Sequence, residues 1–168
     1  MAEGSENKGK PLMLVAVDDS EHSFYALEWT LDHFFAHGTN HPFKLIVIHA
    51  RSSASSALGV AGFGSVDFMT YLEADMKKST SKTVQKAKDV CTSKKATTVQ
   101  VEDVEVEVME GDPRNVMCDA VDKHHASLLV VGSHGYGLVK RAVLGSVSDY
   151  CAHHVKCSVM IVKKPTKP

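Results

Sequence analysis

Short apolar runs alternate with longer amphipathic segments through the chain, and this alternation restricts its fold more than any other feature. The runs consist mainly of valine, leucine and isoleucine, which favour strands. They occupy residues 12–17, 44–49, 127–131 and 158–162. Between the runs, apolar residues recur at helical spacing, as Phe24, Leu27 and Leu31 do in the first intervening segment. Alternating strands and helices are typical of a parallel sheet covered by helices.

A further strand is predicted at 101–108, where valine alternates with acidic residues. This pattern exposes one face of the strand to solvent, so we expect the strand to lie toward an edge of the sheet. The expected fold class is α/β, with a single doubly wound five-stranded parallel sheet, strand order 3-2-1-4-5, and helices on both faces. That order would bring the ends of the first and fourth strands to the crevice where such sheets bind ligands.

Four helices are expected between the strands. The first begins after Asp19 or Ser20, either of which is a plausible N-cap. The third begins at Asp112-Pro113, with aspartate at the cap and proline in the first position, and the last covers 147–154. The second spans about 66–94, and its recurring apolar side chains are Phe68, Tyr71, Leu72, Met76, Val84 and Ala87.

One domain is the simplest organisation for 168 residues, of which 43% are hydrophobic. We expect a disordered tail at residues 1–10, one folded domain at 11–164 and a C-terminal tail at 165–168. A net charge of −1 offers no basic excess for nucleic acid or an anionic membrane, and no apolar run approaches the roughly 20 residues of a membrane helix. A polar N-terminus and four cysteines without CxxC spacing indicate a cytoplasmic protein, with the nucleus as the alternative.

A glycine-spaced segment follows the fourth strand: Gly132-Ser133-His134-Gly135, nine further residues, then Gly145-Ser146. Residues 146–150 are predicted to form the first turn of a helix. Glycines allow positive φ and close backbone approach, and a helix N-terminus presents unpaired N–H groups with a partial positive charge. The hydroxyls of Ser146 and Ser148 add donors. The segment therefore predicts an anion site, most simply for the phosphate of a nucleotide.

Two common phosphate-binding motifs do not match this segment. A Rossmann fingerprint would place GxGxxG after the first strand, and a Walker A loop would need lysine where Leu138 follows Gly137. The remaining pattern, G-x2-G-x9-G-S, resembles the nucleotide-binding signature of the universal stress protein family, in its ATP-binding branch. The resemblance covers nearly the whole chain, from Leu12 to Lys163, and the Asp-Pro-Arg helix start is similar to that of plant members.

The resemblance implies a site for an adenine nucleotide, whether ATP, ADP or AMP. The implied nucleotide-binding residues are Ala16, Val17, Asp18, Ala50, Val131, Gly132, His134, Gly135, Gly145, Ser146, Val147 and Ser148. In family members the base lies against the ends of the first two strands and the aspartate contacts the ribose. By the same resemblance, the residues from Gly132 onward are expected to line the phosphate path and hold the phosphates.

The resemblance also implies Mg²⁺ on the phosphates and a homodimer. Family members dimerise by pairing their final strands, which here means Ser158–Val162 of two copies. This strand is apolar on both faces, and an unpaired edge strand invites pairing. A monomer with a covered edge is the alternative.

Structural roles remain open for the individual residues. The glycine segment could be only a turn, Asp18 could merely cap the first helix, and His134 could fill space. His33 and His37 lie four residues apart and could bind a metal, although no third ligand has matching spacing. A mobile loop is expected at 52–64, which is rich in Ser, Ala and Gly.

No catalytic residue is predicted. No lysine occupies a P-loop position, and no pair of carboxylates is placed for general acid–base catalysis. The expected function is that of a homodimeric, adenine-nucleotide-binding stress-response module. Two alternatives are a slow ATP hydrolase that uses the segment around His134 and a nucleotide-free, chaperone-like scaffold.

Overall fold

The computed structural model describes residues 9–35, 41–53, 66–97, 104–134 and 144–165. The strands in this part of the chain are β1 (Leu12–Val17), β2 (Lys44–Arg51), β3 (Glu105–Glu110), β4 (Leu128–Gly132) and β5 (Ser158–Val162). The helices are α1 (Glu21–Phe34), α3 (Val66–Thr97), α4 (Pro113–His124) and α5 (Ser146–His154). Most of both expected tails and of the expected loop at 52–64 lies outside the described residues.

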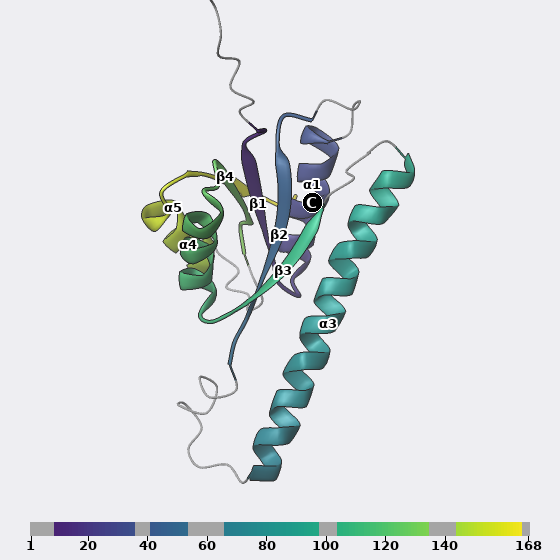
Figure 1. Cartoon of the computed structure of the whole chain (residues 1–168), viewed down its shortest axis with the longest axis vertical. Coiled ribbons are helices and arrows are strands. Elements are labelled where there is room, and N and C mark those ends of the chain that lie inside the picture. Colours follow the sequence, from purple (N-terminus) through teal and green to yellow (C-terminus); the bar gives the residue numbers. More distant parts are fainter. Residues whose placement is uncertain (1–8, 36–40, 54–65, 98–103, 135–143, 166–168) are drawn as a thin grey trace, which may run out of the picture.

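The strands form one parallel sheet in the order β3-β2-β1-β4-β5 (Figure 1). Val15 in the central strand β1 lies opposite Val47 of β2 on one side and Val130 of β4 on the other. The predicted fold class and strand order are therefore confirmed. The acidic strand β3 lies at one edge, as its alternation predicts, but it extends to Glu110; the predicted residues 101–103 lie outside the described part.

Each face of the sheet is covered by a pair of helices. Helices α1 and α3 pack on one face, where Met13 and Val15 contribute to a buried apolar cluster. Helices α4 and α5 pack on the other face, where Leu14 belongs to a second cluster. Successive residues of β1 point to opposite faces, so one short strand supplies both cores.

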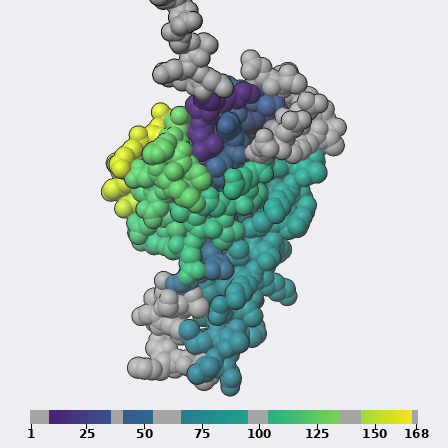
Figure 2. Space-filling view, in the orientation of Figure 1, coloured from purple at the N-terminus to yellow at the C-terminus, as the bar shows by residue number. Residues whose placement is uncertain are grey.

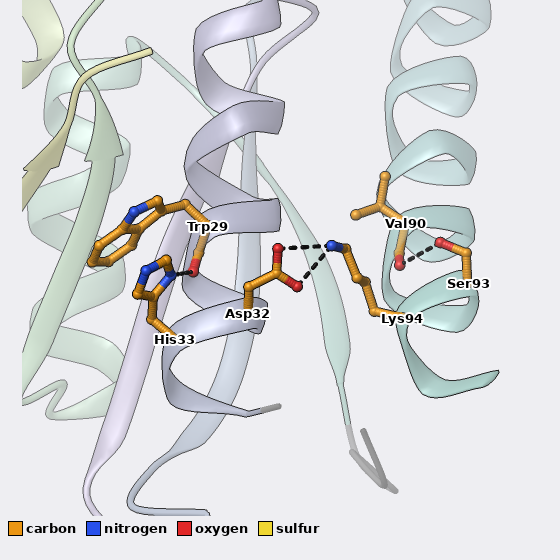
Figure 3. A network of polar contacts seen from close by, with 6 residues as sticks. All are labelled: Trp29, Asp32, His33, Val90, Ser93 and Lys94. Carbon is orange, nitrogen blue, oxygen red and sulfur yellow. Dashed lines mark hydrogen bonds and ion pairs between the residues drawn. The ribbon is translucent and has the colours of Figure 1, made fainter. Parts of the chain in front are cut away.

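An ion pair joins the two helices of the first face (Figure 3). The Lys94 ammonium of α3 lies 2.7 Å and 2.8 Å from the two carboxylate oxygens of Asp32 on α1. On another side of α1, His33 donates from Nδ1 to the Trp29 carbonyl at 2.8 Å and its ring stacks on the indole. The contacts with Trp29 give His33 a structural role. His37 lies outside the described residues.

Helix α3 is much longer than the strands it covers, and its N-terminal half extends past the sheet (Figures 1 and 2). The predicted apolar side is buried only where it meets the sheet: Ala87 is fully buried, whereas Phe68 is 49% and Tyr71 70% exposed. Among the described helices, α3 included, none combines the length and hydrophobicity needed to cross a membrane.

Candidate functional site

The carboxyl end of β1 is organised by a short hydrogen-bonded turn. Ser20 is the N-cap of α1, and its hydroxyl oxygen accepts from the Ser23 N–H at 3.2 Å. The Asp18 carboxylate in turn accepts from the Ser20 N–H at 3.0 Å and from the Ser20 hydroxyl. Of the two expected caps, Ser20 is therefore the one used, and Asp18 holds the capping residue in place.

The segment that joins β4 to α5 is anchored at both of its ends. The Ser133 N–H donates to the Val162 carbonyl at 3.0 Å, and the Gly145 N–H donates to the Ser133 carbonyl at 2.8 Å. The second bond brings the end of β4 next to the start of α5. The intervening residues 135–143, which include the predicted site residue Gly135, lie outside the described part of the chain.

Helix α5 begins without a side-chain cap. Its N-cap is Gly145, and the Asp149 N–H makes the first helical bond, to the Gly145 carbonyl at 2.9 Å. The N–H groups of Ser146, Val147 and Ser148 consequently have no acceptor inside the helix. Three donors and the positive end of the helix dipole are thus presented at one place.

The two serines of this turn differ in their surroundings. Ser148 is 3% exposed, and its hydroxyl donates to the carbonyl of Gly145 at 2.9 Å, with the Ser133 carbonyl at 3.3 Å. Ser146 is exposed. The Ser148 hydroxyl therefore holds the loop ends together, while Ser146 is open to solvent at the start of the helix.

Positive φ was expected for the glycines of this segment, but the two that the structure describes, Gly132 and Gly145, do not adopt it. Gly145 has φ −64° and ψ 155°, an extended N-cap conformation, and Gly111 is the glycine with positive φ among the described residues. Gly132 is required by packing instead, because a Cβ there would lie 2.9 Å from the carbonyl carbon and oxygen of His22. The first turn of α1 thus passes directly over the end of β4.

These elements enclose a cavity of about 380 Å³ at the carboxyl ends of the strands. Eleven of the twelve predicted site residues line it: Ala16, Val17, Asp18, Ala50, Val131, Gly132, His134, Gly145, Ser146, Val147 and Ser148. The twelfth, Gly135, is not described. The cavity spans β2, β1 and β4, where the strand order reverses, which is the position expected for a ligand in a doubly wound sheet.

Three further residues line the cavity that were not among the predicted set: Ser23, Pro113 and Met117. Ser23 lies in the first turn of α1, and the other two lie in the first turns of α4. Pro113 and Met117 were assigned to a helix start and a buried stripe, and the sequence holds no signal that the same stripe reaches the cavity. The apolar surfaces of Pro113 and Met117 line the cavity together with those of Ala16 and Val131.

The cavity thus combines apolar walls with a polar side. Ala50 lies on the β2 side, while the α5 N-terminus and His134 lie on the β4 side. His134 contacts Ser133, with 3.0 Å between Nδ1 and Oγ, and its ring centroid is 5.2 Å from that of His22. No group of three or more His, Cys, Asp or Glu in the described ranges could hold a metal ion. Such walls suit an organic ligand with a flat apolar part and an anionic part.

The start of α4 borders the same cavity and carries an ion pair. Asp112 is its N-cap, accepting from the Arg114 N–H at 2.9 Å, and the Arg114 guanidinium forms a two-pronged contact with both carboxylate oxygens. Hydrogen bonds from this guanidinium lower the pKa of the Asp112 carboxyl from 3.8 to about 2. The carboxylate is therefore charged at neutral pH and fixes the helix start beside Pro113.

Known proteins share both the sequence pattern and the fold. The model of the universal stress protein family matches residues 12–163. Universal stress protein PHOS32 of Arabidopsis thaliana is 31% identical over 162 residues, covering 90% of this chain and 64% of the relative. This chain thus spans less than two thirds of that relative's length.

Two solved structures of family members have the same architecture. One, from Arabidopsis thaliana with AMP bound, gives a TM-score of 0.61 at 23% identity over 92% of both chains. Another, a universal stress protein in complex with cAMP, gives 0.59 at 23% identity over 92% of this chain and 97% of that one. Because the family model covers nearly the whole folded region, the chain belongs to the universal stress protein family.

Proposed function

We propose that this protein binds an adenine nucleotide in the cavity at the ends of β2, β1 and β4. The observation that carries the proposal is the uncapped N-terminus of α5, which opens into a cavity of about 380 Å³ that is otherwise largely apolar. Bound AMP and cAMP in two family members of the same fold support the same ligand class. A nucleotide matches both parts of the cavity.

The base would occupy the apolar part. Ala16 and Ala50 line one side, Val131 lies in the sheet beneath, and Met117 of α4 offers a polarisable thioether for contact with an aromatic ring. The backbone of Val17 would fix the orientation of the base. Asp18 lies beside these residues, where its carboxylate would accept a hydrogen bond from a ribose hydroxyl.

The phosphates would bind at the start of α5. The N–H groups of Ser146, Val147 and Ser148 lie together there, and the exposed Ser146 hydroxyl and the His134 ring adjoin them. Hydrogen bonds to charged groups contribute about 1.5–3 kcal/mol each. Several of them, less the cost of ordering the ligand, make a micromolar dissociation constant reasonable, at about −8 kcal/mol. Gly132 and Gly135 remain proposed members of this phosphate path.

Mg²⁺ would be held mainly by the nucleotide. Asp18 is the carboxylate that lines the cavity, and Mg²⁺ usually keeps several waters and is bound through few carboxylates together with substrate phosphates. The donor set therefore fits a metal that arrives with ATP. The described residues do not supply a separate protein-held site.

Calorimetry with ATP, ADP, AMP and cAMP, each with and without Mg²⁺, tests the proposal. Gly145→Val adds bulk at the α5 N-cap and should weaken binding tenfold or more, about 1.4 kcal/mol. Gly9→Val is the matched control, because nothing lies within 4 Å of a Cβ at Gly9. Equal affinities for both folded variants would contradict the proposed phosphate site. Unchanged melting of the wild-type protein in millimolar ATP and Mg²⁺ would instead favour a nucleotide-free scaffold.

Slow ATP hydrolysis is a second candidate function, favoured by the position of His134 in the cavity wall beside Ser133. An imidazole there could orient water near a terminal phosphate. Phosphate release that persists in the wild-type protein and disappears in His134→Ala, with nucleotide binding retained, would support turnover. Equal, background-level release from both proteins would leave binding as the function.

We further propose that two copies associate through β5 and act as a stress-response module in the cytoplasm. β5 is an edge strand with half-buried Val159, Met160 and Ile161. All four cysteines are free thiols, which is usual in a reducing compartment. Nucleotide occupancy would then be the signal that such a module carries.

A further inference from the structure

The N-terminal half of α3 presents a face that nothing in the described structure covers. From Val66 to Lys82 no residue of this helix is buried, and the first buried residue is Thr83. Figures 1 and 2 show this part of α3 extending past the end of the sheet. Tyr71 is 70% exposed there. Val66 and Phe68 are exposed on the same half, at 82% and 49%, so large apolar side chains gather in solvent there, as they do at interaction sites.

The outward residues of this half follow an ordered charge pattern. The exposed residues concerned are Asp67, Tyr71, Asp75, Lys78 and Lys82. At about 100° per residue they share an arc of roughly 80° along the helix. The acids come first and the lysines second, with the tyrosine between the acids. None of the three residues Asp75, Lys78 and Lys82 belongs to an ion pair of the described structure, whereas Glu73 and Lys77 on another side pair with each other at 3.0 Å.

We infer that this face binds the same face of a second copy of the chain, as an antiparallel helix pair. With a two-fold axis between Met76 and Lys77, Asp75 of each copy would meet Lys78 of the other. In the same register Tyr71 would meet Lys82, an arrangement suited to a cation–π contact. A parallel pair would place like charges opposite one another, so the charge order selects the antiparallel arrangement and makes the face self-complementary.

The contact is small. The segment from Tyr71 to Lys82 is about 18 Å long, and one helix face of that length buries less than the roughly 800 Å² per partner of a standard interface. Association should therefore be weak, so the measurement must extend from about 10 μM to 1 mM protein. The face lies far along the chain from β5, and this inference does not depend on strand pairing or on nucleotide.

Charge reversal and its rescue test the inference. Sedimentation equilibrium of the full chain should show an average mass that rises with concentration. Asp75→Lys alone and Lys78→Asp alone should each lower the association constant about tenfold. Each substitution puts like charges opposite one another at both of the symmetric contacts between residues 75 and 78. The double variant Asp75→Lys/Lys78→Asp should recover the association. An equal mixture of the two single variants should recover it as well, because their faces complement each other.

Lys88→Asp is the matched control, since Lys88 is exposed on the same helix about 120° around it from Lys82. It should leave the association constant unchanged, and circular dichroism should show that all variants keep their helix content. Repeating the measurements on α3 variants that also carry a charged residue in β5 separates association through α3 from strand pairing. A wild-type mass that stays constant to 1 mM, or single variants that lose association without recovery in the double variant and the mixture, would overturn the inference, even if another protein binds the face.

Discussion

Gly132 shows how one missing side chain fixes the distance between two elements. A Cβ at this position would lie 2.9 Å from the carbonyl carbon and oxygen of His22 and 3.1 Å from the Ser23 nitrogen, all backbone atoms of α1. Backbone cannot move aside as the end of a flexible side chain does. The first turn of α1, which carries Ser23 into the cavity wall, therefore depends on glycine at the end of β4.

Gly132→Ala should consequently destabilise the fold by about 1–3 kcal/mol, the usual cost of overpacking. The melting temperature should fall by about 2–4 °C for each kcal/mol in a chain of this size. Thermal and urea unfolding measure the effect, with Gly9→Ala as the control at an open position. A variant as stable as the wild type would show that α1 moves away from β4 without cost.

At the level of elements, Asp112 makes the stability of the start of α4 depend on pH. Its pKa is lowered from 3.8 to about 2, first by hydrogen bonds from the Arg114 guanidinium. A lowered folded-state pKa stabilises the fold above the unfolded value near 3.8, and this contribution is lost as pH falls toward 2. The carboxylate is about two-fifths exposed, so solvent reduces the ionic part of the effect.

Asp112→Ala should therefore lower the free energy of unfolding by about 1 kcal/mol at pH 7, the usual value of an N-cap. The difference from wild type should be complete above pH 5 and should shrink as pH falls through 4 toward 3. Asp112→Asn keeps a capping oxygen without the charge, so it should retain much of the stability and lose the pH dependence. Melting curves across this range make the comparison, and a difference that grows on acidification would contradict the assignment.

The elements themselves could largely be predicted from sequence. The bounds of β1 and β5 agree with their apolar runs, and α4 starts at Pro113 as its cap signal predicts, because these signals are local. The role of Gly132 could not be predicted, since it depends on α1, more than one hundred residues earlier in the chain. The exposure of Tyr71 was also missed, because helical period does not report where the sheet ends.

For the whole molecule, the two edges of the sheet differ in a way that bears on assembly. The β3 edge carries Glu105, Glu107 and Glu110, and charged residues on an edge strand oppose pairing with another sheet. Glu107 also contacts Lys123 and His124 of α4, and these contacts fix its carboxylate at that edge. The β5 edge has only apolar side chains after Ser158. Strand pairing between copies is therefore expected at β5 rather than at β3.

A lysine placed at each edge tests this difference directly. Ile161→Lys puts a charge among the half-buried apolar residues of β5 and should convert the proposed dimer to monomer at about 10 μM, as measured by light scattering. Glu105→Lys places the same side chain on the exposed opposite edge and should leave the mass unchanged. A wild-type monomer at this concentration, or equal loss of mass in both variants, would count against pairing at β5. If Ile161→Lys becomes monomeric and still binds nucleotide with wild-type affinity, the cavity at the ends of β2, β1 and β4 is complete within one chain and assembly is a separate property of the edge.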